Sequence, residues 1–261
     1  MSTGNVAFEV AGGVATLRLC NPSRRNAMSI AMWHQLAGFA ADLAGREDVR
    51  VVIIRGDGHK AFSAGADITD FASRRGAGEA ARAYDNLVED TCRAIEAIPQ
   101  PTVALVVGAC MGAGVSIAAS CDLRIAAEDA FFSVPAARLG LGYDPRGIAR
   151  CVRVFGADAT RELIFLADRL PAGRAAELGA VSRLVPAERI DALAAEWTGR
   201  IASNAPMTIK AAKLAVRAHV LEDSGLLAEV ERLYAAADAS SDYAEGRRAF
   251  AEKRIPRFTG R

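Results

Sequence analysis

Histidine is scarce in this chain, and no metal-ligand spacing is present. The 261 residues contain three histidines, which stand far apart, and five cysteines that form no Cys-x-x-Cys pair. Because a zinc site needs closely spaced histidine or cysteine ligands, we expect no metal centre. The scattered cysteines, and a start without a basic stretch followed by an apolar run, favour a reducing, cytoplasmic setting.

Excess charge and long apolar runs are also lacking. The formal net charge is +1, and no apolar run reaches the roughly 20 residues that a membrane-spanning helix needs. We therefore expect neither a nucleic-acid nor a membrane partner. Hydrophobic residues make up 51% of the chain and charged residues 24%, which is typical of a globular protein with one large core.

Strand and helix patterns alternate over the first half of the chain, which indicates an α/β protein. Apolar residues at 6–10 and 14–19 alternate around Gly12-Gly13, and this pattern predicts a β-hairpin. A helix is predicted over 29–44, with Ser29 as its N-cap and Gly45 at its end. Further strands are expected at 51–55, 102–107, 123–126 and 131–132, and further helices after Asp67, up to Ile98 and at 114–120.

Helical spacing dominates the second half. It predicts helices at 145–155, 158–167, 172–178, 186–204, 207–221, 226–239 and 242–253, with one short strand at 183–185. Residues 72–80 are rich in serine, arginine and glycine, a composition typical of a mobile loop.

Two glycine-bearing turns stand where a strand pattern gives way to a helix pattern. They are Ala64-Gly65-Ala66-Asp67, after the strand expected at 51–54, and Gly112-Ala113-Gly114, after the strand expected at 102–107. The first backbone N–H groups of a helix have no partner within that helix. Two such turns converging on one point would therefore form a paired N–H site for a negatively charged oxygen.

The surroundings of both turns resemble the crotonase superfamily, the enoyl-CoA hydratase/isomerase proteins. The resemblance covers essentially the whole chain and rests on stretches that occur in the family's order, namely 21–28 (Asn-Pro-Ser-Arg-Arg-Asn-Ala-Met), 60–68, 108–114, 121–126 and 250–254. It implies a right-handed spiral of strand-strand-helix turns over residues 1–200, which would carry the acyl-CoA site. It also implies a C-terminal helical region, 201–261, that packs subunits into a homotrimer or a dimer of trimers. No compositional linker separates the two regions, so we treat the second as an appendage of one domain.

The resemblance implies how the site works. The N–H groups of Ala66 and Ala113, the latter following Gly112, would hold a thioester oxygen and stabilise an enolate. Coenzyme A would be part of the substrate, and no prosthetic group is implied. Alternatively, the turns only allow the two helices to pack closely.

Two positions depart from the pattern of classical enoyl-CoA hydratases. Ser116 and Ala136 stand where those enzymes have the glutamates that position and activate water. Neither residue can exchange a proton as a carboxylate does, so the resemblance does not support the two-glutamate mechanism. Ser116 could instead hydrogen-bond to a substrate or to water.

Asp144 matches the place where some isomerases of the family carry a proton-shuttling aspartate. Because it directly precedes Pro145, it also has the sequence signature of a helix N-cap. An apolar pocket would raise the pKa of this carboxyl group, whereas capping would lower it. Tyr143 is a candidate neutral donor or pocket wall.

The remaining candidates come from family positions, and each has a plainer alternative as a solvated charge or a packing residue. Contacts with coenzyme A are expected from Arg24, Arg25, Lys60, Ala64, Asp67, Ile68, Phe250 and Lys253, the last pair from a neighbouring subunit. Asp67 is expected mainly to fix the first turn. The acyl pocket is expected to be walled by Ala136, Leu139, Leu141 and Tyr143.

Three functions remain open. The first is an enoyl-CoA isomerase or atypical hydratase in which Asp144 transfers the proton. The second is a decarboxylase or carbon-carbon lyase acting on a CoA thioester, which needs less proton machinery. The third is a non-catalytic acyl-CoA-binding scaffold. Neither the acyl group nor the choice between trimer and hexamer follows from the sequence.

Overall fold

The computed structural model describes residues 4–67 and 78–261. The helix expected after Asp67, Ile68 and most of the loop expected at 72–80 lie outside the described residues.

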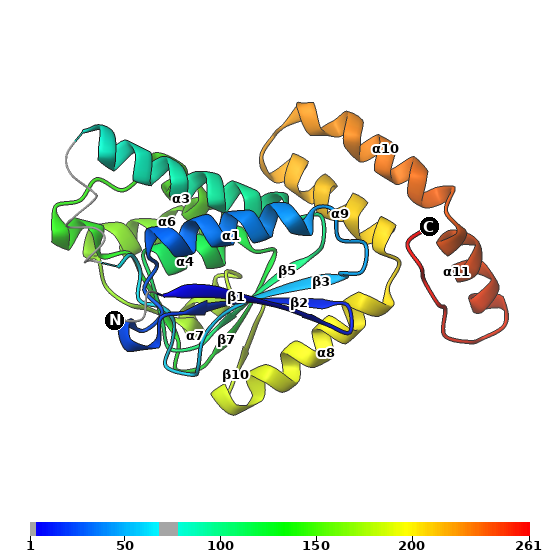
Figure 1. Ribbon diagram of the computed structural model, residues 1–261, viewed down its shortest axis with the longest axis horizontal. Helices are drawn as coiled ribbons and strands as arrows, with labels where there is room; N and C mark the ends of the chain where they lie inside the picture. Colours follow the sequence, from blue (N-terminus) through cyan, green and yellow to red (C-terminus); the bar gives the residue numbers. More distant parts are fainter. Residues whose placement is uncertain (1–3, 68–77) are drawn as a thin grey trace.

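A six-stranded sheet forms the centre of the molecule (Figure 1). Its order is β1-β2-β3-β5-β7-β10, with β1 and β2 antiparallel and all other neighbours parallel. The strands are β1 (Asn5–Ala11), β2 (Val14–Cys20), β3 (Val51–Gly56), β5 (Thr102–Val106), β7 (Leu123–Ala127) and β10 (Arg183–Val185). The hairpin turn at Gly12 and Gly13 uses positive φ angles, a region that favours glycine.

A smaller sheet of four short strands has the order β4-β6-β8-β9. It consists of β4 (Ala61–Ser63), β6 (Ala109–Met111), β8 (Phe131–Ser133) and the antiparallel β9 (Leu170–Pro171). Each of its parallel strands is the next strand in the chain after a strand of the large sheet. The units β3-β4, β5-β6 and β7-β8 therefore repeat the same strand-strand step, and a helix follows each step in which the chain is described.

The large sheet is covered on both faces. On one face lie α1 (Ile30–Leu43), α3 (Glu79–Ala97) and α4 (Ala113–Ser120), and on the other lies α8 (Ile190–Ser203) (Figure 1). Successive residues of β3 face opposite sides of the sheet, because Val52 belongs to the hydrophobic cluster that includes α1, while Val51 belongs to the separate cluster that includes Ile190 of α8. Burial on both faces accounts for the nearly continuous apolar composition of these strands.

The other helical elements are distributed along the chain from Pro22 to Leu226. They are the 3₁₀ helices η1 (Pro22–Arg24), η2 (Pro135–Leu139), η4 (Ala187–Arg189) and η5 (Ser224–Leu226), the helices α5 (Pro145–Phe155), α6 (Ala157–Arg161) and α7 (Ala172–Glu177), and the π-helical η3 (Glu162–Leu166).

Three helices extend beyond the sheets at the C-terminus. They are α9 (Pro206–Val220), α10 (Leu227–Asp238), which packs along α9, and α11 (Ser241–Ala251) (Figure 1). Lys213 of α9 forms an ion pair with Asp122 at 2.7 Å, and the same carboxylate accepts a hydrogen bond from the N–H of Thr102. This contact attaches α9 to the large sheet. The boundary expected between residues 200 and 201 falls inside α8. Within the described part of the chain, no helix is both long and apolar enough to cross a membrane.

Most of the predicted elements are confirmed, and the hairpin, α5 and β10 match closely. The glycine turns follow the strands expected at 51–54 and 102–107, but the short strands β4 and β6, which the sequence patterns do not predict, lie between. Strands of three residues are too short to show an alternating pattern. The helix expected over 158–167 is also divided, because its second half adopts π geometry.

Candidate active site

The two glycine-bearing turns lie in contact. A Cβ atom added to Gly112 would stand 3.9 Å from the Cα of Gly65, and one added to Gly65 would stand 3.3 Å from the carbonyl oxygen of Met111. Both glycines have positive φ, +45° and +102°, so an L side chain would be strained at either. The turns follow β4 and β6, and the parallel pairing of these strands brings both turns to one edge of the small sheet.

Each turn carries a backbone N–H group for which residues 4–67 and 78–261 provide no acceptor. The groups around Ala66 are engaged, since the Gly65 carbonyl accepts from the Met28 N–H at 2.7 Å and the Asp67 N–H donates to the Met28 carbonyl at 2.9 Å. The N–H of Ala66, and that of Ala113 at the start of α4, donate to no acceptor in the described residues. Two such donors on touching turns have the chemistry required to stabilise one oxyanion.

The first turn is fixed by a buried carboxylate. Asp67 is 8% exposed, and its side chain pairs with the guanidinium of Arg24 and lies 3.5 Å from the amide of Asn21. These contacts agree with the structural role expected for Asp67. They also engage Arg24, which was expected to contact coenzyme A.

A pair of hydroxyl groups lies one helical turn beyond Ala113. Ser116 of α4 is 5% exposed, and its Oγ lies 3.1 Å from the Oη of Tyr143. Burial raises the pKa of the Tyr143 phenol, which therefore stays protonated. Gly147 provides the space for this ring, because a Cβ at that position would stand 3.0 Å from Tyr143 Cε1.

Asp144 is both a helix cap and a member of an ion pair. Its Oδ1 accepts from the backbone N–H of Arg146 at 2.8 Å, which caps α5. The guanidinium of Arg146 donates to both carboxylate oxygens, with Nε to Oδ1 at 3.0 Å and Nη2 to Oδ2 at 2.7 Å, and also reaches Asn86 of α3. The hydrogen bonds from Arg146 hold the pKa of Asp144 below its usual range.

The middle of α5 is held against α3 by a buried ion pair. Arg150 and Glu89 are each 2% exposed, and two hydrogen bonds of 3.2 and 2.8 Å join their side chains. The Nε of Arg150 also donates to Glu96 at 2.9 Å. Neither Arg146 nor this ion pair was predicted from the sequence, although Glu89 and Glu96 lie two helical turns apart on one face of α3.

The expected pocket residues lie in and after η2. Ala136 is buried and belongs to the main hydrophobic core, and Leu141 packs partly against that core. Leu139 is 70% exposed. Ala136 and Ser116 therefore provide no carboxylate to the candidate site.

The expected contacts with coenzyme A are spread over the molecule. Lys60, Arg25 and Lys253 are exposed, Ala64 is half-buried and Phe250 is 88% exposed. Figure 1 shows α11, which carries Phe250, at the end of the molecule opposite the start of α3. In a single chain, the C-terminal candidates therefore do not join the candidates near the glycine turns.

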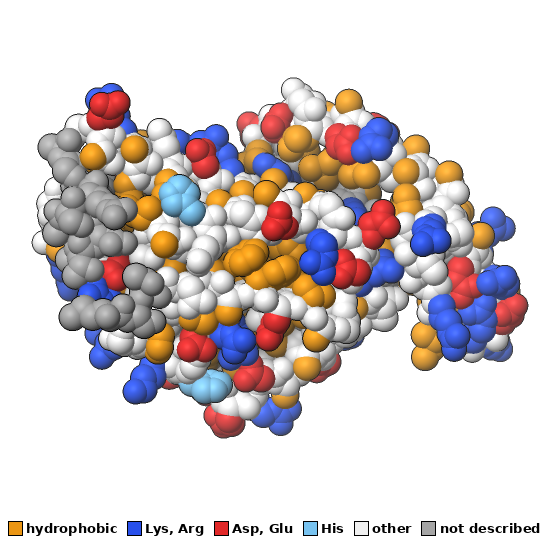
Figure 2. All heavy atoms as spheres, in the orientation of Figure 1, with side chains coloured by type: hydrophobic (Ala, Val, Ile, Leu, Met, Phe, Trp, Pro, Cys, Tyr) orange, Lys and Arg blue, Asp and Glu red, His pale blue; other side chains and the backbone are white. Residues whose placement is uncertain are grey.

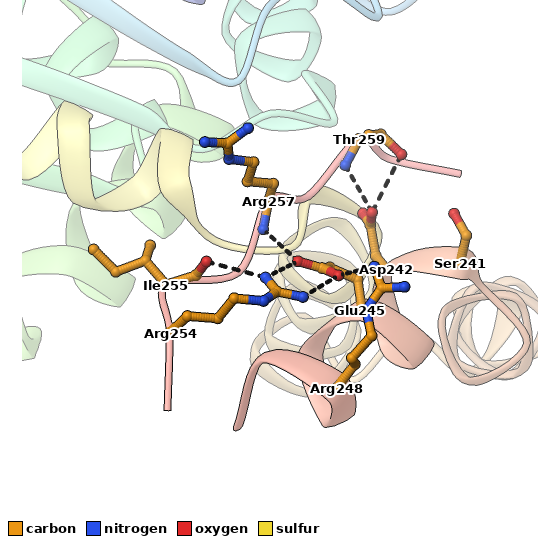
Figure 3. Close-up of a pocket in the computed structure, with 8 residues that line it drawn as sticks. All are labelled: Ser241, Asp242, Glu245, Arg248, Arg254, Ile255, Arg257 and Thr259. Atoms are coloured by element: carbon orange, nitrogen blue, oxygen red, sulfur yellow. Dashed lines mark hydrogen bonds and ion pairs between the residues drawn. The ribbon is translucent and has the colours of Figure 1, made fainter. Parts of the chain in front are cut away.

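The chain end beside Lys253 is held by charged contacts (Figure 3). Glu245 of α11 accepts hydrogen bonds from Arg254 at 2.6 Å, from Arg248 at 2.5 Å and from the N–H of Arg257 at 3.0 Å. Figure 2 shows basic and acidic side chains gathered at the end of the molecule where Figure 1 places α11. The hydrogen bonds of Glu245 hold the chain that follows α11 against this helix, and they thereby fix the path of the chain next to Lys253.

In the part of the chain that the structure describes, neither a group of metal ligands nor a reactive thiol accompanies the site. The described residues include no group of three or more possible metal ligands. Cys110 is buried, and burial raises the pKa of its thiol well above the usual value. A thiol in that state is not an activated nucleophile.

Comparison with known proteins identifies close relatives along the full length. Residues 9–261 match the family described as Enoyl-CoA hydratase/isomerase. A probable enoyl-CoA hydratase of Mycobacterium leprae is 35% identical over 98% of this chain and 99% of its own length. A methylmalonyl-CoA decarboxylase of Escherichia coli is 32% identical over 95% of both chains. The crystal structure of an enoyl-CoA hydratase/carnithine racemase from Magnetospirillum magneticum superposes with a TM-score of 0.92 at 33% identity, covering 100% of this chain and 97% of that one. These likenesses confirm the expected crotonase-type fold.

Proposed function

Because the chain belongs to the enoyl-CoA hydratase/isomerase family, we propose that it binds an acyl-CoA thioester with the carbonyl oxygen between the N–H groups of Ala66 and Ala113. The observation that carries this proposal is the contact between the two glycine turns, each followed by an N–H group without an acceptor in the described residues. Donors placed in advance stabilise the charge that develops on the oxygen as an enolate forms.

Asp144 is the residue we propose for proton transfer in enoyl-CoA isomerisation or in an atypical hydration. It lies directly after Tyr143, whose hydroxyl reaches the first helical turn beyond Ala113. Arg146 keeps the carboxylate ionised at neutral pH, which is the form that accepts a proton. The same contact weakens its basicity, so a bound substrate would have to displace part of the Arg146 hydrogen bonding to gain a stronger base.

Decarboxylation or carbon-carbon cleavage of a CoA thioester is the second candidate. The paired state of Asp144 favours it, because these reactions form the enolate by losing a fragment and need no base to remove a carbon-bound proton. A relative that is named a methylmalonyl-CoA decarboxylase supports the same direction.

One experiment tests both candidates. The protein is incubated in heavy water with crotonyl-CoA, a dienoyl-CoA and methylmalonyl-CoA, and the products are analysed by mass spectrometry. Deuterium uptake at the α- or γ-carbon of an enoyl-CoA is the result expected from proton transfer, and loss of carbon dioxide from methylmalonyl-CoA is expected from the second candidate. If no thioester is changed although all of them bind, both enzymatic proposals are wrong and the scaffold function is favoured.

We further propose that Phe250 and Lys253 bind the nucleotide of coenzyme A in a neighbouring subunit. Their distance from the glycine turns in one chain supports this arrangement, in which residues 201–261 form the subunit contact. Arg24, Arg25 and Lys60, with Ala64, Asp67 and Ile68, would complete the nucleotide site.

Replacing Lys253 by alanine is expected to weaken binding of coenzyme A about tenfold, because a charge-assisted contact with the 3′-phosphate is lost. Calorimetric titration would compare coenzyme A with a pantetheine thioester, which has no nucleotide and should bind unchanged. Lys210→Ala on α9 removes the same charge elsewhere and serves as the control. An equal loss for both ligands would contradict the assignment.

A further inference from the structure

We propose that the hydroxyl pair of Ser116 and Tyr143 selects substrates whose acyl group carries an acceptor oxygen on its first carbons beyond the thioester. This inference rests on the proposed function, since it assumes a thioester held at Ala66 and Ala113. It adds the class of acyl group that the site accepts.

The first support is the unusual orientation of the Ser116 hydroxyl. Buried serine and threonine side chains in helices commonly donate to the carbonyl four residues earlier. In this protein the hydroxyls of Thr91, Ser120, Thr160 and Thr198 all do so, at 2.7 to 2.8 Å. Ser116 has no such bond in the described residues, although Ser120 in the same helix has one. Its Oγ instead lies 3.1 Å from Tyr143 Oη.

The second support is the number of protons. Two hydroxyl groups carry two O–H protons, and the bond between Oγ and Oη uses one of them. The other has no acceptor among the described residues. Ser116 is 5% exposed and Tyr143 is partly buried. When a ligand covers the pair, a donor left without an acceptor costs about 1–3 kcal/mol, so a ligand that supplies an acceptor oxygen is favoured over one that does not. Because Tyr143 stays protonated, the pair is neutral and offers a donor, whereas a glutamate at position 116 would offer acceptors only.

The third support is the distance from the proposed oxyanion site. Ser116 is three residues after Ala113, the first residue of α4, which corresponds to about 4.5 Å along the helix axis. Helical side chains lean toward the N-terminus, and this brings the hydroxyl back toward the Ala113 N–H. A thioester oxygen at that N–H would leave the next one or two carbons of the acyl group beside the hydroxyl pair.

The acceptor on these carbons can be a ketone oxygen or a carboxylate. The two share the same chemistry, namely an oxygen that accepts from a neutral hydroxyl. A plain alkyl chain has no such oxygen and would leave the donor unsatisfied.

Calorimetric titration with butyryl-CoA, acetoacetyl-CoA and malonyl-CoA tests the proposal, with each ligand checked by mass spectrometry afterwards. The full-length protein is compared with Tyr143→Phe and Ser116→Ala, and Ser120→Ala is the matched control on the same helix. We expect the unchanged protein to bind an oxygen-bearing ligand more tightly than butyryl-CoA. Tyr143→Phe should weaken that ligand about 3- to 10-fold for a ketone and about 10- to 100-fold for a carboxylate, and leave butyryl-CoA unchanged.

The outcomes separate this inference from the proposed function. Weakened malonyl-CoA binding identifies a carboxylate acceptor, and weakened acetoacetyl-CoA binding identifies a ketone. If Tyr143→Phe alters no ligand, or weakens all three equally, the hydroxyl pair is structural and the inference is wrong while acyl-CoA binding stands. If the unchanged protein binds none of the three, the proposed function fails and the inference falls with it.

Discussion

Replacing Ala113 by proline is expected to lower turnover of the CoA thioester by about 10²- to 10³-fold while the protein stays folded. The substitution replaces the N–H hydrogen by the ring carbon Cδ of proline, so it removes the donor and also adds a carbon atom on the side of the proposed oxyanion. That N–H donates to no acceptor in the described residues, so no internal hydrogen bond is lost. Ala113 is also the first residue of α4, a position where proline is well tolerated because its fixed φ suits the start of a helix. Loss of one donor to a developing oxyanion typically costs about 2.7 to 4 kcal/mol of barrier height.

Ala113→Ser is the matched control, because it changes the side chain at the same position and keeps the N–H. Circular dichroism and the thermal midpoint would establish that both variants are folded. The substrate is whichever thioester the panel identifies, and single-turnover rates would separate chemistry from binding. If the proline variant is folded and turns over at the unchanged rate, Ala113 is not an oxyanion donor and the proposed site is wrong.

The secondary structure was largely predictable because long apolar patterns determine it. The alternation in the β1-β2 hairpin and the 3.6-residue spacing of α5 each extend over several repeats. By contrast, β4 and β9 have three residues and two residues. Their pairing is specified by neighbouring strands, which no local pattern reveals. The π-helical segment at 162–166 lies within the helix predicted over 158–167, and apolar spacing over five residues does not distinguish π from α geometry.

The candidate site was predictable only where the backbone determines it. The glycine turns carry their conformation in the sequence, and their contact follows from the parallel pairing of β4 with β6. The contact between Ser116 and Tyr143 joins residues 27 positions apart on different elements, so no spacing rule reveals it. The ion pair of Arg146 with Asp144 spans two positions, yet the N-cap signature predicts only the backbone hydrogen bond.

Asp144→Asn is expected to lower proton exchange at the α- or γ-carbon of a bound enoyl-CoA by about 10²-fold or more, the scale of a lost general base. Asparagine caps helices about as well as aspartate, so α5 should keep its start and acyl-CoA affinity should survive. The ion pair with Arg146 is lost as well, but Arg146 is partly exposed and this should cost stability little. Deuterium uptake followed by mass spectrometry measures the exchange rate.

The pH dependence gives Asp144 a second signature. Arg146 favours the ionised carboxylate, so the folded-state pKa of Asp144 lies below its ordinary value of 3.8. A base with such a pKa loses activity only as pH falls through that lowered value, and exchange should therefore be independent of Asp144 ionisation across the neutral range. The stability that the ion pair contributes follows the same sign, being present above pH 3.8 and lost on acidification through the folded-state pKa.

Asp144→Ala completes the test because it removes the base and the cap together. It should match Asp144→Asn in exchange rate but lose an additional 0.5 to 2 kcal/mol or so of unfolding free energy, the usual range for a lost N-cap. Full exchange activity in Asp144→Asn, with instability confined to Asp144→Ala, would mean that Asp144 is only a cap. Proton transfer would then belong to another group, and the assignment of Asp144 as the base would be wrong. Absence of exchange in the unchanged protein would instead favour decarboxylation or carbon-carbon cleavage at the oxyanion site, since neither reaction needs a base to remove a carbon-bound proton.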